Sequence, residues 1–342
     1  MNTADTFMEP KRILYINVTR IGDTLLATPA VRAVAARWPG AEIHLLAHPK
    51  REEVVRHLPF VTHSGAITKG LAPWMGHLGA RRYDIGFVCN FDKPLIAYAL
   101  RVADQVVAFR QDDDAINRRL HRAVELPPPR NEHAVDTQLR LPASLGIPPA
   151  GRALAYNVAR SESEWARRFL AQRKLSEARP LIGLQVASFP TKAYRDWPLP
   201  HFIELCRRLR QAWPRAHFLI FGGKLEKERT AALATELGNC ATLCAGKLSL
   251  RETAALMNCT DLYVGVDTGP THIMGALHRP LVALYHGYSP SKLLAPLEHP
   301  CLYVVDHPHA GPECTPLETM ADISVDHVWQ VTQRALTEHP PQ

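Results

Sequence analysis

Short apolar runs alternate with longer stretches of helical periodicity along most of the chain. In the first half, the apolar runs predict strands at Ile13–Asn17, Glu42–Ala47, Ile85–Cys89 and Gln105–Ala108. The stretches between and after them predict helices at Leu25–Trp38, Arg51–Leu58, Pro94–Arg101 and His133–Leu145. Alternation of this kind favours an α/β fold with a parallel sheet covered by helices.

The second half repeats this rhythm and ends on one more helix. Its predicted strands are Leu181–Gln185, His217–Phe221, Ala241–Cys244, Leu262–Gly265 and Leu281–Tyr285. Its predicted helices are Pro200–Trp213, Glu226–Leu237, Leu250–Asn258, Pro270–Leu277 and Val325–Leu336. We interpret the segments Glu162–Lys174 and Ser176–Pro180 as the hinge. The expected domains are therefore residues 1–165 and 176–324, with a closing helix over 325–342.

Polar residues with a glycine follow one buried strand in each half. In the second half the sequence from Asp267 to His272 joins a predicted strand to a predicted helix through Gly269. The first turn of such a helix offers unpaired N–H groups and a positive dipole end, which together suit phosphate. In the first half, Arg20, Gly22 and Asp23 lie in the equivalent position. Two such units predict two domains facing each other across a cleft, with ligands beyond the carboxyl ends of the strands.

Composition narrows the class of protein. The chain has 342 residues and a formal net charge of +7, from 40 basic and 33 acidic residues. This balance favours anionic partners such as nucleotides or phosphorylated glycans. The sequence has no helix-turn-helix, RNA-binding or zinc-finger pattern, so we expect no nucleic-acid partner. It also has no long apolar run and no signal-peptide pattern, so we expect a cytoplasmic protein.

The seven cysteines give no metal-binding pattern. Their number is odd, several lie in apolar runs, and no two are spaced as CxxC. We therefore expect buried reduced thiols rather than zinc ligands.

Five motifs occur in the order and spacing of one family. They are the loop at Arg20–Asp23 with Thr28-Pro29-Ala30, the segment Lys192–Pro198, Phe221-Gly222-Gly223, the segment Ala245–Leu250, and Asp267–His272. With these motifs the chain resembles the bacterial heptosyltransferases, glycosyltransferase family 9. The resemblance implies a GT-B fold of two Rossmann-like domains, with the acceptor in the N-terminal domain and the nucleotide sugar in the C-terminal domain. It further implies inverting transfer of heptose from ADP-L-glycero-D-manno-heptose to the lipopolysaccharide inner core, with no metal and no cofactor.

The resemblance places the catalytic aspartate at Asp23. An inverting transfer needs one carboxylate to accept the proton of the acceptor hydroxyl, and losing such a base costs about 10²–10⁴ in rate. The alternative is that Asp23 caps a helix beginning at Thr24, where its loss would cost about 1 kcal/mol of stability.

Donor binding is expected from residues of the second half. The resemblance implies that Thr268, Gly269 and His272 contact the diphosphate and that Asp267 fixes the loop or meets sugar hydroxyls. The other expected donor contacts are Ser188, Thr191, Lys192, Arg195, Glu226 and Leu248.

Three of these assignments leave alternatives open. The family carries a lysine three positions before the proline of its Trp-Pro pair, and this chain has Arg195 there. Either Arg195 replaces that lysine or Lys192 reaches the diphosphate instead. Glu226 matches the acid that binds the ribose hydroxyls, although Glu228 is close enough to take that role. Leu248 matches an apolar residue against adenine, and core packing is its alternative.

Acceptor binding is less defined. Arg20 lies beside Asp23 and could meet a Kdo carboxylate or a core phosphate, and Lys93 and Arg119 are further candidates. The resemblance implies an acceptor presented at the inner face of the inner membrane, and leaves open whether the protein is peripheral there. A different nucleotide sugar, a protein acceptor, or sugar-nucleotide binding without catalysis are the alternative functions.

Overall fold

The computed structural model describes residues 9–77 and 82–341 and divides into two compact units, with the boundary between Asn157 and Val158. Residues 162–172, which we interpreted as part of the hinge, lie in helix α6 (Arg160–Gln172) and belong to the second unit. Among the described residues, none of the helices is both long and apolar enough to cross a membrane.

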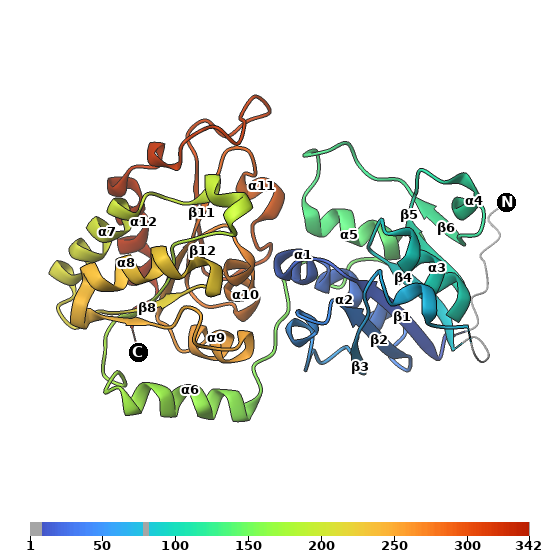
Figure 1. The fold of residues 1–342 in the computed structure, drawn as a ribbon, viewed down its shortest axis with the longest axis horizontal. Coiled ribbons are helices and arrows are strands. Elements are labelled where there is room, and N and C mark those ends of the chain that lie inside the picture. The colour runs from blue at the N-terminus through green and yellow to red at the C-terminus, as the bar shows by residue number, and fades with distance from the viewer. Residues whose placement is uncertain (1–8, 78–81, 342) are drawn as a thin grey trace. The chain divides into compact units, whose positions relative to one another are not determined.

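The first unit is built around a parallel sheet. Its described strands pair in the order β3-β2-β1-β4-β5-β6. They are β1 (Arg12–Asn17), β2 (Glu42–Ala47), β3 (His63–Ala66), β4 (Tyr83–Val88), β5 (Ala103–Phe109) and β6 (Arg122–Val124). The helical segments are α1 (Ile21–Leu26), α2 (Thr28–Arg37), α3 (Lys93–Val102), α4 (Asp114–Asn117), α5 (Ala134–Ala143), and the 3₁₀ turns η1 (Glu52–Val54) and η2 (Ala72–Trp74). Helices α1, α2 and α5 cover one face and α3 the other (Figure 1).

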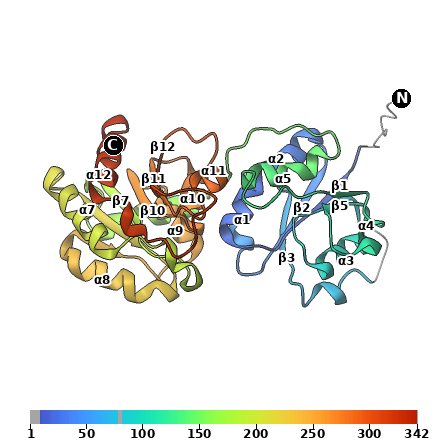
Figure 2. The ribbon, with the colours of Figure 1, turned by 90° about the horizontal axis from the view of Figure 1, so that it is seen from above.

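The second unit has the same architecture. Its described strands pair in the order β12-β11-β10-β7-β8-β9, again all parallel. They are β7 (Leu181–Gln185), β8 (His217–Phe221), β9 (Ala241–Leu243), β10 (Leu262–Val266), β11 (Leu281–Tyr285) and β12 (Leu302–Asp306). Besides α6, the helices are α7 (Leu199–Ala212), α8 (Lys227–Leu237), α9 (Leu250–Met257), α10 (Gly269–Leu277), α11 (Ser291–Leu294) and α12 (Val325–Glu338). The 3₁₀ turns are η3 (Pro190–Arg195), η4 (Lys224–Glu226), η5 (Gly238–Cys240) and η6 (Met320–Asp322). Figure 2 shows α7, α8 and α12 together on one side of this unit.

Burial on both faces explains the strand sequences. All residues of β7, β10 and β11 are buried, so these strands are continuous apolar runs rather than alternating ones. Trp197 is fully buried in the core of the second unit, and its indole N–H donates a 2.8 Å hydrogen bond to the carbonyl of Ile323. The predicted α/β class with two Rossmann-like units is therefore confirmed.

Several predicted elements are wrong in detail. The helix predicted over Leu25–Trp38 is two helices, α1 and α2, because a break at Ala27 separates them. The helix predicted over Arg51–Leu58 is only the 3₁₀ turn η1. Strands β3, β6 and β12 were not predicted.

Cysteine burial agrees with the expectation of free thiols. All seven cysteines are free, and five of them are buried. Burial raises the pKa of the Cys89 and Cys244 thiols to about 12, so both are protonated at neutral pH.

Gly275 allows α10 to pack closely against the chain that follows α11, and this generates a prediction. A Cβ at Gly275 would lie 2.3 Å from Cγ of Pro296. Gly275→Ala should therefore lower the free energy of unfolding by about 1–3 kcal/mol through overpacking, although propensity alone would favour alanine in a helix by about 0.8–1.0 kcal/mol. Urea unfolding followed by circular dichroism measures this.

Gly40→Ala is the matched control, because no atom lies within 4 Å of its added Cβ. It should change stability by less than about 0.5 kcal/mol. A Gly275→Ala protein as stable as the wild type would contradict the close packing of α10.

Candidate functional site

Three loops of the second unit lie at neighbouring strand ends. Strands β10, β7 and β8 are adjacent in the sheet, so the loops after Val266, Gln185 and Phe221 share its carboxyl edge. The chain order reverses here, because β7 lies between β10 and β8. This is the position where open α/β sheets bind ligands.

A buried carboxylate joins two of these loops. Asp267 is 2 % exposed, and its Oδ2 lies 2.7 Å from Nη1 of Arg195. Its Oδ1 lies 3.2 Å from Nε2 of His272. Burial alone would raise the pKa of Asp267, but the hydrogen bond from His272 and the charge of Arg195 hold it below the ordinary value. The carboxylate is therefore ionised at neutral pH.

The turn after Asp267 begins α10 as predicted. Thr268 is the N-cap residue, and Gly269 and Pro270 follow as the first helical residues. His272 is also buried, and no described residue offers a hydrogen-bond partner to its Nδ1. The first turn therefore offers its own N–H groups, while Nδ1 of His272 is buried behind it without a partner among the described residues.

The two candidate cations of the loop after β7 lie in different environments. Arg195 is committed to Asp267, with a side chain 19 % exposed. The Nζ of Lys192 lies 5.6 Å from the ring centre of Tyr194, which Arg195 also approaches at 5.6 Å. No carboxylate among the described residues lies within ion-pair distance of Lys192.

Ser188 holds its own loop. Its hydroxyl lies 2.6 Å from Oδ1 of Asp196 and 2.7 Å from the carbonyl oxygen of Lys192, while its N–H donates to the same carboxylate at 2.7 Å. Burial raises the pKa of Asp196. Arg229, which the sequence did not single out, donates to the carbonyl oxygens of Val186 and Trp197 and so braces this loop. Thr191, in contrast, is exposed.

Glu226 and Leu248 lie after β8 and β9. Glu226 is half-buried and accepts a hydrogen bond from the N–H of Gly223, whereas Glu228 is exposed. Burial also raises the pKa of Glu226. Leu248 lines a cavity of about 590 Å³ together with Arg173 and Lys247. It is therefore only half-buried, with part of its surface facing an open volume.

In the first unit, Asp23 lies in the first turn of α1. This helix begins at Ile21 with Arg20 as its N-cap residue, so the interpretation of Asp23 as a helix cap is wrong. The loop before it is fixed by Asn90, whose side-chain amide exchanges two hydrogen bonds with the backbone of Val18. The Asp23 side chain is exposed.

Asp23 opens onto a cavity of about 420 Å³ that carries several cations. Arg20, Arg51 and Lys69 line this cavity together with His48. Arg51 is held by a 3.1 Å hydrogen bond to the carbonyl oxygen of Thr19, and Lys69 pairs with Asp92 at 2.7 Å. An arrangement of cations around one exposed carboxylate suits an anionic ligand that carries a hydroxyl group.

Of the three predicted acceptor residues, only Arg20 lines this cavity. Lys93 begins α3 and pairs with Asp113 at 3.2 Å, and Arg119 is exposed after α4. Arg51 and Lys69 were missed. Both follow strand ends, which is the signal that could have identified them, but the strand before Lys69 was itself not predicted.

The ion pair at Asp267 generates a prediction on stability. Asp267→Asn should cost about 3 kcal/mol at pH 7, because it leaves Arg195 without its buried partner. The pKa of Asp267 is lower in the folded state than in the unfolded state. The ionised carboxylate therefore contributes to the free energy of unfolding at pH values above the ordinary aspartate pKa. This contribution is lost as the pH falls through the folded-state pKa. The difference between wild type and variant should therefore be constant from pH 6 to 8 and shrink below about pH 4, as followed by urea unfolding at each pH.

Asp326→Asn is the matched control, because its pair with Arg208 is 76 % exposed on the aspartate side. It should cost less than about 1 kcal/mol at every pH. If Asp267→Asn and Asp326→Asn lowered the free energy of unfolding equally, the buried pair would stabilise the fold no more than an exposed one.

Comparison with known proteins gives the family and the fold. The family model for glycosyltransferase family 9 (heptosyltransferase) matches residues 77–320. Lipopolysaccharide heptosyltransferase 2 of Escherichia coli K12 is 26 % identical over 314 residues, covering 84 % of this chain and 86 % of the relative. A glycosyl transferase family 9 structure from Veillonella parvula superposes with a TM-score of 0.81 at 19 % identity, covering 96 % and 97 % of the two chains. The structure of E. coli heptosyltransferase WaaC with ADP gives a TM-score of 0.71 at 19 % identity, covering 95 % and 99 %. The α/β fold is thus that of the GT-B heptosyltransferases, and the chain belongs to glycosyltransferase family 9.

Proposed function

We propose that this glycosyltransferase moves heptose from ADP-L-glycero-D-manno-heptose to the inner core of lipopolysaccharide, with inversion at the anomeric carbon. In this reaction the acceptor hydroxyl oxygen bonds to the anomeric carbon and the bond from that carbon to the diphosphate oxygen breaks. Asp23 takes the hydroxyl proton and ADP leaves with the bonding electron pair. The observation that carries the proposal is the exposed carboxylate of Asp23 beside a cation-lined cavity.

The acceptor side belongs to the first unit. Arg20, Arg51 and Lys69 would bind carboxylates or phosphates of the lipopolysaccharide core, which is an acidic glycan. Arg51 is placed for this role by its hydrogen bond to the backbone of Thr19. Lys93 and Arg119 would act further along a larger acceptor, since neither lines the cavity at Asp23.

The donor side belongs to the second unit, and the donor would be an ADP-activated sugar, since the structurally similar E. coli heptosyltransferase WaaC was solved with ADP. The first turn of α10 would hold the diphosphate through Thr268, Gly269 and His272. Glu226 would accept from the ribose hydroxyls, and Leu248 would pack against adenine. Ser188 and Asp267 would act by holding the loops, while Thr191 is exposed and would reach the phosphates with its hydroxyl.

Lys192 is the better candidate for stabilising the departing diphosphate. The positive charge of Arg195 is already compensated by Asp267, whereas Lys192 has no carboxylate partner among the described residues. A cation that acts on charge developing in the transition state contributes most when it is not neutralised beforehand. We infer that Lys192 supplies this charge in place of a metal ion and that Arg195 positions the α10 turn.

Two features of the substrates stay open within the proposal. A different nucleotide sugar or a protein acceptor is the alternative. Sugar-nucleotide binding without catalysis is disfavoured by the exposed Asp23. We place the reaction in the cytoplasm, at the inner face of the inner membrane where the acceptor is exposed.

Replacing Asp23 tests the general base. Asp23→Asn should lower kcat by about 10²–10⁴ because Asp23 is the one carboxylate among the described residues that line the cavity, while the thermal midpoint changes little because the side chain is exposed. The measurement is transfer from ADP-heptose to a panel of truncated lipopolysaccharide cores. The core that the wild type modifies identifies the acceptor.

Asp92→Asn is a useful control, because it removes a nearby carboxylate that pairs with Lys69 without removing the proposed base. It should change the KM for the acceptor far more than kcat. If the wild type binds ADP-heptose but modifies no core, the assignment of the acceptor is wrong, and if Asp23→Asn keeps full kcat, the assignment of the base is wrong.

Replacing Lys192 tests which cation serves the leaving group. Lys192→Gln should lower kcat by about 10²–10³, the usual effect of losing one electrostatic contact to a transition state, with unchanged stability. Arg195→Gln should instead lower stability, because Asp267 would be left buried without its ion pair. Lys292→Gln, an exposed change on α11, controls for charge alone. The opposite pattern, with stability lost in Lys192→Gln only, would exchange the two roles.

A further inference from the structure

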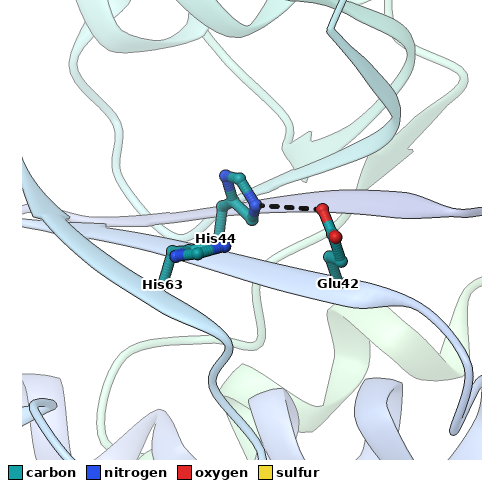
Figure 3. Close-up of side chains that lie close together, drawn as sticks. All are labelled: Glu42, His44 and His63. Atoms are coloured by element: carbon teal, nitrogen blue, oxygen red, sulfur yellow. Dashed lines mark ion pairs between the residues drawn. The ribbon is translucent and has the colours of Figure 1, made fainter.

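A cluster of one carboxylate and two imidazoles lies away from the proposed catalytic machinery. Glu42 and His44 are two residues apart on β2, and His63 is the residue of β3 paired with His44. Alternate residues of one strand and paired residues of adjacent strands project from the same face of a sheet. Figure 3 shows the three side chains gathered there, with the carboxylate of Glu42 directed toward the imidazole of His44.

The spacing of these side chains suits a metal ion. One ligand atom from each residue lies within 4.8 Å of the other two. The closest described approach between Glu42 and His44 is 3.6 Å, from Oε2 to Nε2, and the rings of His44 and His63 lie 4.5 Å apart. Zinc bonds of about 2.0–2.1 Å in tetrahedral geometry place ligand atoms roughly 3.3 Å from one another. To reach this separation, the ligand atoms must move closer together. Glu42 and His63 can do so by changing rotamer, because their side chains are exposed.

The surroundings of His44 orient it as a ligand. Its Nδ1 lies 3.2 Å from the phenol oxygen of Tyr83 on β4. Its Nε2 is buried and has no hydrogen-bond partner among the described residues. A metal-binding histidine characteristically uses its second nitrogen in such an outer hydrogen bond, which fixes the ring and leaves the first nitrogen for the metal.

The local charge permits binding. Glu42 supplies one negative charge, and the nearby Arg12 opposes a cation. Imidazole nitrogens with a single carboxylate favour borderline metals such as Zn²⁺ over Mg²⁺ or Ca²⁺.

We propose that Glu42, His44 and His63 bind one divalent transition-metal ion of the zinc class. The cluster lies near the amino ends of β2 and β3, whereas Asp23 follows the carboxyl end of β1 in the same parallel sheet. The ion would therefore be structural, joining the edge strand β3 to β2, and would take no part in sugar transfer.

The test is zinc binding by the full-length protein without a histidine tag. Isothermal titration and elemental analysis after desalting should give one zinc per chain, and Co²⁺ should produce visible absorption bands of a nitrogen- and oxygen-ligated site. His63→Ala and Glu42→Gln should each weaken binding at least about tenfold, and Tyr83→Phe about tenfold through loss of the outer hydrogen bond. The His63 and Glu42 variants come first because both side chains are exposed, so folding is not at risk.

His327→Ala is the matched control, since this histidine is exposed on α12 in the other unit. It should bind zinc like the wild type. Zinc retained at full affinity by His63→Ala places the metal elsewhere and overturns the proposal, as does a wild-type protein that binds no zinc at micromolar concentration.

Discussion

The ion pairs of the buried Asp267 carboxylate are the interactions on which the candidate donor site of the second unit depends. Removing a carboxylate from water is costly unless charges and hydrogen bonds replace the lost solvation. Here Arg195 engages one oxygen and His272 engages the other, so one side chain ties the loop after β7 to the first turn of α10. The same contact decides the chemistry of its neighbours, because an arginine compensated by Asp267 has little charge left for a substrate. For this reason we favour Lys192 over Arg195 as the cation that would stabilise the departing diphosphate.

The parallel sheets explain how residues so distant in sequence come together. In each unit the first strand is flanked on both sides by later strands, and the loops that follow them gather at one edge. The strands with residues buried on both faces were predictable, since β7 and β10 are uninterrupted apolar runs. Strands β3 and β6 were not predictable in this way. They lie at the edges of the first sheet, are short, and carry polar residues such as His63 and Arg122, so pairing rather than hydrophobic pattern makes them strands.

The residues of the candidate sites also divide into those that could be predicted from the sequence and those that could not. Asp23, Asp267 and His272 could be singled out as candidates because each lies within three residues of a glycine, where a buried strand is followed by a helix. The structure adds what sequence spacing does not contain. It shows that Asp23 is the third residue of α1 rather than its cap, and that Ser188 is engaged with Asp196. It also brings in Arg51 and Lys69, which line the cavity through tertiary packing; the strand before Lys69 was not predicted.

Strand β3 runs from the amino edge of the first sheet to its carboxyl edge. His63 begins this strand at the amino edge, and the chain leaves its carboxyl end into Thr68, Lys69 and Gly70, which line the cavity beside Asp23. An edge strand of four residues has neighbours on one side only, so its position is weakly determined by backbone pairing alone. A metal ion shared by His63 and β2 would restrict the strand at its start and, through it, the loop that carries Lys69. The metal cluster would then lie at the amino end of β3, and Lys69 would follow its carboxyl end. By fixing the start of β3, the metal would stabilise the loop that presents Lys69 to an acceptor.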